Sequence, residues 1–463
     1  MSFRKYLIGV VLLVLIAGCA STGVDAPPPA ATIGDKSIAD KHNDRRLDAA
    51  LTIDNEEHVV PGLPVFRLTN DDKIPSLPLY RLARNEKIVA VQVLLFNCPT
   101  LREVEGKIKE LKRAGVNTLI FRVFQNRGDR FYPFARPLNE VGVYFNSAHA
   151  PVVGDILGDL ARISRANDMK IFAWMTTRYA DYGMENKKGW QAVKYDLGSE
   201  RFTPAKGLNL FRRDVKNHLG SLYRDLAAYD IDGILFQDDL VLKHTEGFSH
   251  DARNAFAAEF GQMPNHKDFY KGVFTAEDGR QMVSSYGEGF WKWSRWKNRA
   301  LLNVASEIMK EVKRIKPDMK FAINLMYEAA IYPENALAWL SQDLDEAVRT
   351  GFDLYAIMAY HRQMARELNV KGVALDSLMS KLVEKTLEKV KDPAKVLIKL
   401  QISDWETQEI VSHEEINSML RLINKKGSPS LAFVPYRDSF DFRKVAPFLG
   451  HDHDLRLASA SEK

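Results

Sequence analysis

Residues 214–239 read DVKNHLGSLYRDLAAYDIDGILFQDD, and this stretch contains one complete step of the fold. Over Asp214–Tyr229 the apolar residues recur at three- and four-residue spacing, which predicts an amphipathic helix. Ile231–Phe236 is a short apolar run, which predicts a strand buried on both faces. Asp238 and Asp239 follow where that strand ends. The stretch therefore predicts a helix that leads back to a buried strand, with two carboxylates at the strand's carboxyl end.

The same alternation occupies the chain from Lys87 onward. The other strand-like runs are Ile88–Phe96, Val116–Phe124, Lys170–Met175, Lys320–Leu325, Leu354–Met358, Val396–Ile402 and Ser430–Val434. Helix-like segments lie between the runs, at Leu101–Ala114, Ile156–Asn167, Trp291–Lys316, Leu337–Arg349, Ser377–Val390 and Glu414–Lys425. Eight buried strands that alternate with helices are typical of the α/β class and of the (β/α)8 TIM barrel.

A doubly wound open sheet is the alternative architecture. Such a sheet usually has a glycine-rich turn after its first strand, whereas here Asn97-Cys98-Pro99-Thr100 follows the first run. We therefore expect the barrel, with long insertions at Arg127–Val153 after the second strand and at Val241–Glu288 after the fourth. Both insertions begin at carboxyl ends of strands, where barrel enzymes build their sites.

The amino terminus resembles a bacterial lipoprotein signal. Arg4-Lys5 precedes an apolar run, Leu7–Ile16, which ends in the lipobox-like sequence Ile16-Ala17-Gly18-Cys19. We expect a lipoprotein signal peptide over residues 1–18 and a lipid anchor on Cys19; an ordinary signal peptide or an uncleaved anchor is the alternative. Because Ala20 rather than Asp follows the cysteine, the sequence predicts attachment to the bacterial outer membrane, on its periplasmic face.

Residues 19–85 have the composition of a tether and a lead-in, with Pro27-Pro28-Pro29-Ala30-Ala31 as a stiff, extended part. The barrel domain is then expected over residues 86–450, followed by a polar tail at 451–463. Cys98 is the other cysteine of the chain, so with Cys19 lipidated the sequence predicts no intramolecular disulfide.

Composition and motifs exclude several classes of function. The 463 residues are 46% hydrophobic and 27% charged, as in ordinary globular proteins. The net charge is only +5 and no basic run occurs, so we expect no nucleic-acid partner. The sequence contains no H-E-x-x-H metal motif, no P-loop and no G-x-S-x-G elbow, so we expect neither a metal nor another cofactor.

The two adjacent carboxylates are the sharpest candidate site. Neighbouring strand residues point to opposite sides, so one of Asp238 and Asp239 should face the barrel axis and the other the adjacent loop. Close carboxylates repel, which raises one pKa and produces an acid beside an ionised partner, as hydrolysis of a glycosidic bond requires. The alternative is that the pair caps the following segment or holds a loop.

Aromatic, amide and acidic side chains follow the other strands and favour a carbohydrate ligand. Sugar rings stack their apolar faces on aromatic rings, while their hydroxyls form hydrogen bonds with polar groups. The resulting candidates for substrate binding from the strand ends are Trp174, Asn324, Tyr360, Asp404, Trp405, Tyr436 and Asp438.

The residues of one long segment point to a family. Leu219–Glu246, LGSLYRDLAAYDIDGILFQDDLVLKHTE, resembles the C-terminal domain of PgaB-type proteins, which process poly-β-1,6-N-acetylglucosamine during biofilm export. The resemblance recurs, in matching order, in KIFAWM at 170–175, WKNRAL at 296–301, YPENALAWLSQDLD at 332–345, AIMA at 356–359, LQISDW at 400–405 and YRDSF at 436–440.

This resemblance implies a (β/α)8 barrel that acts as an endo-glycoside hydrolase on the partially de-N-acetylated polymer. It implies Asp238 and Asp239 as the functional carboxylates, with sugar contacts at the positions of Trp174, Trp405, Tyr436 and Asp438. The implied partners are the exopolysaccharide and an outer-membrane export porin, and no cofactor is implied.

The sequence departs from the family pattern in three places. Gln92 and Leu94 stand in the first strand where the family tends to have acids, and Tyr360-His361-Arg362 replaces its M-P-Y after the sixth strand. The T-F-D-D and H-x-x-x-H ligands of the family's deacetylase domain are missing from this sequence. A non-catalytic polysaccharide-binding protein is therefore the main alternative to a hydrolase, and a deacetylase is disfavoured.

Overall fold

The computed structural model describes residues 87–180, 182–184, 187–276 and 279–449. The predicted signal peptide, the Cys19 anchor, the tether and the polar tail lie outside these ranges, and the predicted domain boundaries stay predictions. Within the described ranges, none of the helices has the length and apolar character needed to cross a bilayer.

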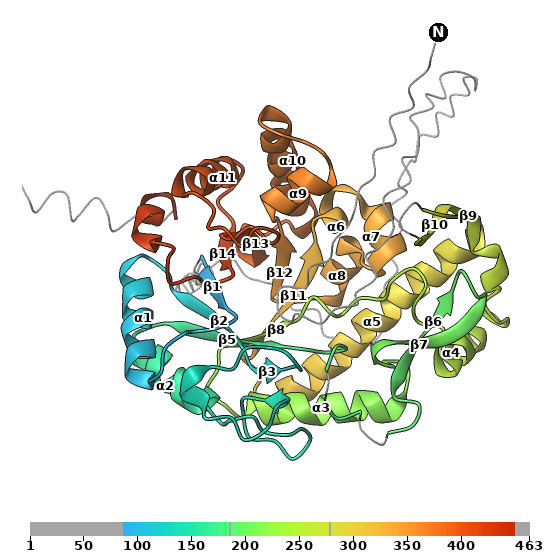
Figure 1. Cartoon of the computed structure of the whole chain (residues 1–463), viewed down its shortest axis with the longest axis horizontal. Coiled ribbons are helices and arrows are strands. Elements are labelled where there is room, and N and C mark those ends of the chain that lie inside the picture. Colours follow the sequence, from blue (N-terminus) through green and yellow to red (C-terminus); the bar gives the residue numbers. More distant parts are fainter. Residues whose placement is uncertain (1–86, 181, 185–186, 277–278, 450–463) are drawn as a thin grey trace, which may run out of the picture. The chain divides into compact units, whose positions relative to one another are not determined.

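Eight parallel strands close into a barrel in the order β1-β14-β13-β12-β11-β8-β5-β2. They are β1 (Val89–Val93), β2 (Thr118–Arg122), β5 (Lys170–Met175), β8 (Gly233–Phe236), β11 (Lys320–Met326), β12 (Leu354–Met358), β13 (Val396–Gln401) and β14 (Ser430–Val434). Each strand falls within or overlaps one of the predicted runs, so the (β/α)8 barrel predicted from the sequence is confirmed. In Figure 1 these strands occupy the centre, and the helices lie around them.

The helices between the strands cover the outside of the barrel. They are α1 (Leu101–Arg113), α2 (Leu157–Ala166), α3 (Arg213–Ala227), α5 (Glu288–Ile315), α7 (Pro333–Leu340), α8 (Leu344–Thr350), α10 (Val373–Val390) and α11 (His413–Lys425). The prediction of one helix over Leu337–Arg349 is wrong. Ser341 adopts a left-handed conformation with φ of 53°, which ends α7, and Asp343 caps the start of α8 by accepting from the Glu346 N–H.

Three insertions extend from carboxyl ends of the strands. After β2 comes the hairpin of β3 (Phe124–Gln125) and β4 (Gly142–Val143), and after β8 come α4 (His250–Phe260), β9 (Tyr270–Thr275) and β10 (Gln281–Tyr286). The third, the hairpin of β6 (Gln191–Asp196) and β7 (Arg201–Leu208) after β5, was not predicted.

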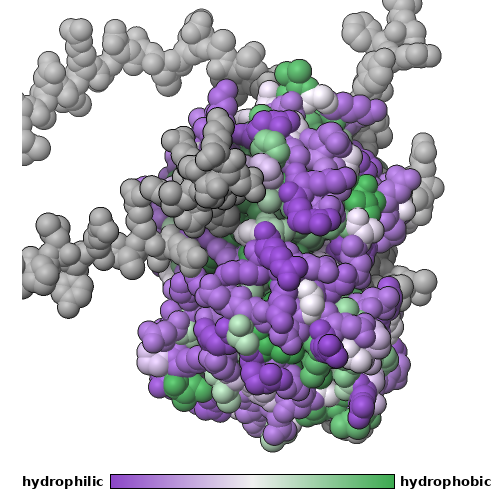
Figure 2. Space-filling model, turned by 90° about the vertical axis from the view of Figure 1, so that its left-hand side faces the viewer, coloured by the Kyte–Doolittle hydropathy of each residue, from purple (hydrophilic) through white to green (hydrophobic). Residues whose placement is uncertain are grey.

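Shorter helices complete the fold. After β11 and β12 stand α6 (Glu328–Ile331) and α9 (His361–Glu367), and 3-10 turns occur at Pro133–Ala135, His266–Asp268, Pro393–Lys395, Phe442–Lys444 and Ala446–Phe448. Figure 2 views the molecule from the side on which Figure 1 labels α1 and α2. On this face hydrophilic residues predominate and hydrophobic ones form small, separate groups, as expected of a solvated helix layer.

The register of the strands identifies an interior layer near the mouth of the barrel. Lys399 of β13 pairs with Ala432 of β14, and Ala432 pairs with Ala90 of β1, which lies two residues before Gln92. The same offset of two residues separates Gln92 from Trp174, Trp174 from Asn324, and Asn324 from Lys399, each pair lying two strands apart around the barrel. The four offsets total eight residues, the shear of a TIM barrel. The layer therefore consists of Gln92, Trp174, Asn324 and Lys399, from alternate strands.

The opposite end of the barrel is packed tightly around Gly233. A Cβ atom on Gly233 would lie 2.3 Å from Cε1 of Phe172, whose ring is buried inside the barrel. Gly106 of α1 differs, because a Cβ atom there would meet nothing within 4 Å.

We predict that Gly233→Ala destabilises the protein by ~1–3 kcal/mol, because the added methyl group forces the Phe172 ring off its position. The matched control Gly106→Ala should raise stability by up to ~1 kcal/mol through its better helix propensity. Urea unfolding measures both. A Gly233→Ala midpoint equal to that of the unsubstituted protein would contradict the packing described for this end of the barrel.

Candidate functional site at the barrel mouth

Asp239 follows β8 and is completely buried. Its carboxylate binds the loop after the neighbouring strand β5, where the N–H groups of Thr177, Arg178 and Tyr179 donate to it over 2.7–3.1 Å. The hydroxyl groups of Thr176 and Thr177 also donate to it. These donors fill the acceptor capacity of a carboxylate, which has about four sites. Asp239 therefore fastens the end of β8 to the loop after β5.

Asp238 has a different environment from its neighbour. Its side chain is half-buried, and its Oδ1 atom is buried without a hydrogen-bond partner among the described residues. Burial raises the pKa of Asp238 above its ordinary value; the ammonium of Lys399 opposes this increase and the charge of Asp239 adds to it. Asp238 is thus the member of the pair with a free oxygen and a tendency to keep its proton.

Lys399 belongs to the interior layer and was missed in the sequence analysis. Its Nζ atom donates to Oδ1 of Asn324 over 2.7 Å, and the Asn324 amide donates to the carbonyl of Phe236, the last residue of β8, over 3.0 Å. Both side chains are almost completely buried. Burial lowers the pKa of Lys399 to about 8, and the negative charge of Asp238 opposes that decrease. The lysine within the predicted strand Val396–Ile402 is the sequence signal that could have identified this residue.

Two of the predicted aromatic residues lie together beside this group. The rings of Tyr360 and Trp405 meet edge to face, with 5.2 Å between their centroids. Burial, together with the charge of Asp238, raises the pKa of the half-buried Tyr360 far above its ordinary value. Tyr360 therefore lies within the electrostatic influence of Asp238.

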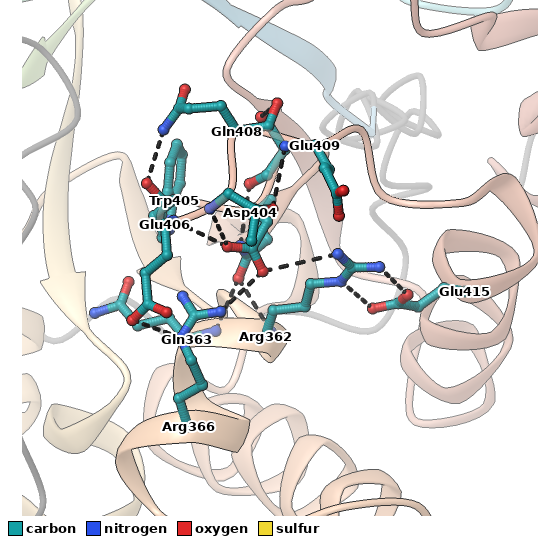
Figure 3. A network of polar contacts seen from close by, with 12 residues as sticks. Arg362, Gln363, Arg366, Asp404, Trp405, Glu406, Gln408, Glu409 and Glu415 are labelled. Atoms are coloured by element: carbon teal, nitrogen blue, oxygen red, sulfur yellow. Dashed lines mark hydrogen bonds and ion pairs between the residues drawn. The ribbon is translucent and has the colours of Figure 1, made fainter.

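Asp404 belongs to a network of ion pairs that holds the loop of Trp405. Figure 3 shows its carboxylate between the guanidinium groups of Arg362 and Arg366, with Glu415 on the far side of Arg362. Arg366 donates to Asp404 over 2.8 Å, and Arg362 donates to both Glu415 oxygens over 2.9 and 2.7 Å. The pKa of Asp404 lies below its ordinary value. Burial raises this pKa, but the hydrogen bonds from backbone N–H groups and from Arg366 lower it by more. Asp404 positions Trp405, and its oxygens are already occupied.

Tyr436 and Asp438, predicted to bind substrate, make their contacts elsewhere. The Tyr436 hydroxyl donates to Asp438 over 2.9 Å, and Asp438 lies 3.6 Å from the Lys107 ammonium of α1. Both residues line a surface pocket that α1 shares with the segment after β14. The structure thus places Trp174 and Asn324 in one interior layer and Tyr360 beside Trp405, whereas Tyr436 bonds Asp438, which lies near Lys107 of α1.

Several buried polar atoms at the strand ends have no hydrogen-bond partner among the described residues. They are Oε1 of Gln92 and Gln237, Nε1 of Trp174 and Trp405, and Oδ1 of Asp238. Native proteins pair most such atoms, so a group of them at one end of a barrel favours a site for a polar ligand. Donors and acceptors both occur, and this combination matches the hydroxyl groups of a sugar.

A second carboxyl pair adjoins the mouth and was also missed. Glu328 follows β11 and Glu367 ends α9, and both are almost completely buried. Tyr327 and Gln363 each donate to Glu367 over 2.8 Å, whereas both Glu328 oxygens lack a partner among the described residues. Burial, together with the charge of Glu367, raises the pKa of Glu328 to about 8.

We predict that this pair makes stability fall as pH rises. Between 4.5, the ordinary pKa of Glu328, and about 8, the folded protein retains a proton that the unfolded chain has lost, so folding weakens across this range. Glu328→Gln imitates the protonated form and should be ~1–3 kcal/mol more stable than the unsubstituted protein at pH 8. Urea unfolding at pH 5 and pH 8 tests this, with the exposed Glu334→Gln as control. Equal pH slopes for all three proteins would refute it.

Among the described residues, no group of three or more His, Cys, Asp or Glu side chains is arranged to hold a metal ion.

Comparison with known proteins agrees with the barrel. Residues 134–434 match the model of hypothetical glycosyl hydrolase family 13. A curated relative, the poly-β-1,6-N-acetyl-D-glucosamine N-deacetylase of Escherichia coli strain K12, is 26% identical over 351 residues, which are 72% of this chain and 47% of the relative. The chain thus spans about half the length of the curated relatives it matches.

Two solved structures share the fold. The PgaB (BpsB) glycoside hydrolase domain from Bordetella bronchiseptica superposes with a TM-score of 0.59 at 20% identity, covering 78% of this chain and 96% of that domain. An α-L-fucosidase from Paenibacillus thiaminolyticus gives a TM-score of 0.51 at 11% identity, covering 79% of this chain and 49% of the other. Since the family model covers well over half of the sequence, the chain belongs to hypothetical glycosyl hydrolase family 13 and is a glycosidase-type barrel protein.

Proposed function

We propose that the chain is an endo-acting glycoside hydrolase for partially de-N-acetylated poly-β-1,6-N-acetylglucosamine, with Asp238 as its general acid. One observation carries the proposal: Asp238 is a half-buried carboxyl at the end of the fourth barrel strand, and its raised pKa favours the protonated form. Glycosidases need such a carboxyl to protonate the leaving oxygen. The polymer is suggested by the name of the Escherichia coli relative and by the sequence resemblance.

The surroundings of Asp238 support a carbohydrate substrate. Tyr360 and Trp405 offer aromatic surface beside it, and the unpaired polar atoms of Gln92, Gln237 and Trp174 lie near the strand ends below it. The catalytic role predicted for Asp239 stays a prediction, and its contacts favour a structural role. The second function in the reaction, that of nucleophile or base, then falls to another group or to the acetamido group of the substrate itself.

A non-catalytic polysaccharide-binding protein is the second candidate. It is favoured by the saturation of Asp239, which leaves a single carboxylate of the pair available to a ligand. Such a protein would use the same barrel mouth to guide the polymer without cleaving it.

We predict opposite consequences for the two adjacent aspartates. Asp238→Asn should lower the rate of polymer cleavage by ~10²–10⁴ while the protein stays folded, since only the acid is lost. Asp239→Asn should lower the free energy of unfolding by ~2–5 kcal/mol, because an amide cannot accept from every donor of the β5 loop. Mass spectrometry of released oligosaccharides measures the first effect, and thermal melting measures the second.

The experiment uses the full chain and partially de-N-acetylated poly-β-1,6-glucosamine. Short oligosaccharides that disappear with Asp238→Asn establish the hydrolase. Polymer that stays intact but binds to the unsubstituted protein and to Asp238→Asn supports the non-catalytic binding protein instead. An absence of binding means that this polymer is not the substrate.

For its location we propose a lipid on Cys19 that holds the protein at the periplasmic face of the outer membrane, beside an export porin. The support is the lipobox-like sequence Ile16-Ala17-Gly18-Cys19. In a Gram-negative host, the protein should incorporate labelled palmitate and fractionate with the outer membrane, and Cys19→Ser should abolish the label. A labelled Cys19→Ser variant would reject the anchor.

A further inference from the structure

Gln401 is the last residue of β13, and its side chain is completely buried. It stands two residues after Lys399, so the two side chains point to the same, interior side of the strand. The amide oxygen of Gln401 accepts from the N–H groups of Arg362 and Gln363 over 3.0 and 3.1 Å. Its amide nitrogen donates to the carbonyl of Ser403 over 3.1 Å. One side chain therefore joins two backbone segments that follow neighbouring strands, β12 and β13.

The first of these segments is the start of α9. Arg362 and Gln363 are the second and third residues of this helix, and their N–H groups are the ones that an N-cap side chain ordinarily binds. Tyr360 occupies the N-cap position, and its side chain makes no such bond. Gln401 thus supplies the cap from the neighbouring strand, and it fixes the backbone directly after Tyr360.

The second segment is the start of the loop that carries Trp405. Ser403, whose carbonyl accepts from Gln401, is completely buried and stands two residues before Trp405. Arg366 of α9 also bonds this loop, through Asp404, but its side chain is 34% exposed. Because water competes for the bonds of an exposed side chain, the buried amide of Gln401 is the firmer connection between the loop and α9.

Each of the two segments carries one ring of the aromatic pair, since Tyr360 meets Trp405 edge to face at 5.2 Å. We propose that Gln401 is a positioning residue of the site: its amide fixes the arrangement of Tyr360 and Trp405, and thereby the aromatic surface that a sugar ring contacts. The use of this surface for a sugar rests on the proposed function. The connection between Gln401 and the two rings does not depend on the substrate.

The residue type fits this role. An amide has an acceptor for the N–H groups of α9 and a donor for the Ser403 carbonyl, whereas a carboxylate only accepts and an apolar side chain does neither. Gln401→Met therefore removes all three bonds at similar volume. Gln401→Ser is a second variant, which leaves room for water to bind the freed backbone groups.

The test first observes Trp405 without a ligand. The full chain is produced with 5-fluorotryptophan, and Trp405→Phe identifies the fluorine resonance of Trp405 among those of the seven tryptophans. Gln125→Met is the matched control, because Gln125 is also completely buried but belongs to the insertion after β2. Its amide accepts from the Tyr144 hydroxyl over 2.6 Å and donates to the Asp129 carbonyl over 2.7 Å.

We expect Gln401→Met to shift the Trp405 resonance and Gln125→Met to leave it in place. An unshifted resonance in folded Gln401→Met overturns the proposal, and so does an equal shift in Gln125→Met. Should Gln401→Met fail to fold, Gln401→Ser is judged by the same two criteria.

Binding of a partially de-N-acetylated β-1,6-glucosamine oligomer is then measured by isothermal titration. Each protein also carries Asp238→Asn, so that no cleavage interferes. Gln401→Met should weaken binding about three- to tenfold, as expected for a misplaced aromatic contact. When Tyr360→Ala and Trp405→Ala are already present, Gln401→Met should weaken binding no further, because the surface that it positions is gone. An equal loss in that background overturns the proposal.

The same measurements separate this inference from the proposed function. If the oligomer does not bind, the proposed substrate is rejected, and the fluorine resonance decides the role of Gln401. If the oligomer binds but the unsubstituted protein does not cleave the polymer, the hydrolase is rejected, and the binding comparison decides. Where cleavage occurs, Gln401→Met should raise KM and leave kcat unchanged. A lower kcat at unchanged KM overturns the positioning role while the hydrolase stands.

Discussion

The barrel mouth depends on one carboxylate, that of Asp239. Three consecutive backbone N–H groups of the loop after β5 bind it, and without it these groups would be buried and unpaired. The loop also contains Arg178, which is fully buried and pairs with Glu246 of the insertion after β8 over 2.6 Å. Asp239 thereby fixes the start of the β6–β7 insertion. The Arg178–Glu246 pair connects this loop with the insertion after β8. The shape of the mouth on this side follows from that contact.

The same contact explains why two adjacent aspartates have different properties. Asp239 turns toward the β5 loop, whereas Asp238 is half-buried and its Oδ1 atom has no hydrogen-bond partner among the described residues. One acid is saturated with hydrogen bonds, whereas for the other burial is the largest influence and raises its pKa. A difference in environment, rather than repulsion alone, separates the two carboxyl groups.

The strands were predictable because runs such as Leu354–Met358 are apolar on both faces, and the alternation with helices then defined the barrel. The partners of Lys399 were not predictable, since its bond with Asn324 crosses the interior between β13 and β11, which are separated by β12. The hairpin β6–β7 was missed because it lacks an apolar run. The resemblance pointed to Tyr436 and Asp438 as sugar contacts, but their bond with each other and the proximity of Lys107 follow from how α1 packs.

Lys399 also bears on whether the mouth is shaped for folding or for chemistry. Burial of a lysine costs stability through lost hydration, and apolar replacements of buried charged groups are often neutral or stabilising. The other three members of the layer, Gln92, Trp174 and Asn324, are uncharged, so the packing of the barrel interior does not require a cation at this height. Lys399 is 1% exposed, and its ammonium donates to the neutral Oδ1 atom of Asn324 over 2.7 Å. The cost of burying this lysine is therefore better explained by a role in the site at the barrel mouth than by stabilisation of the barrel.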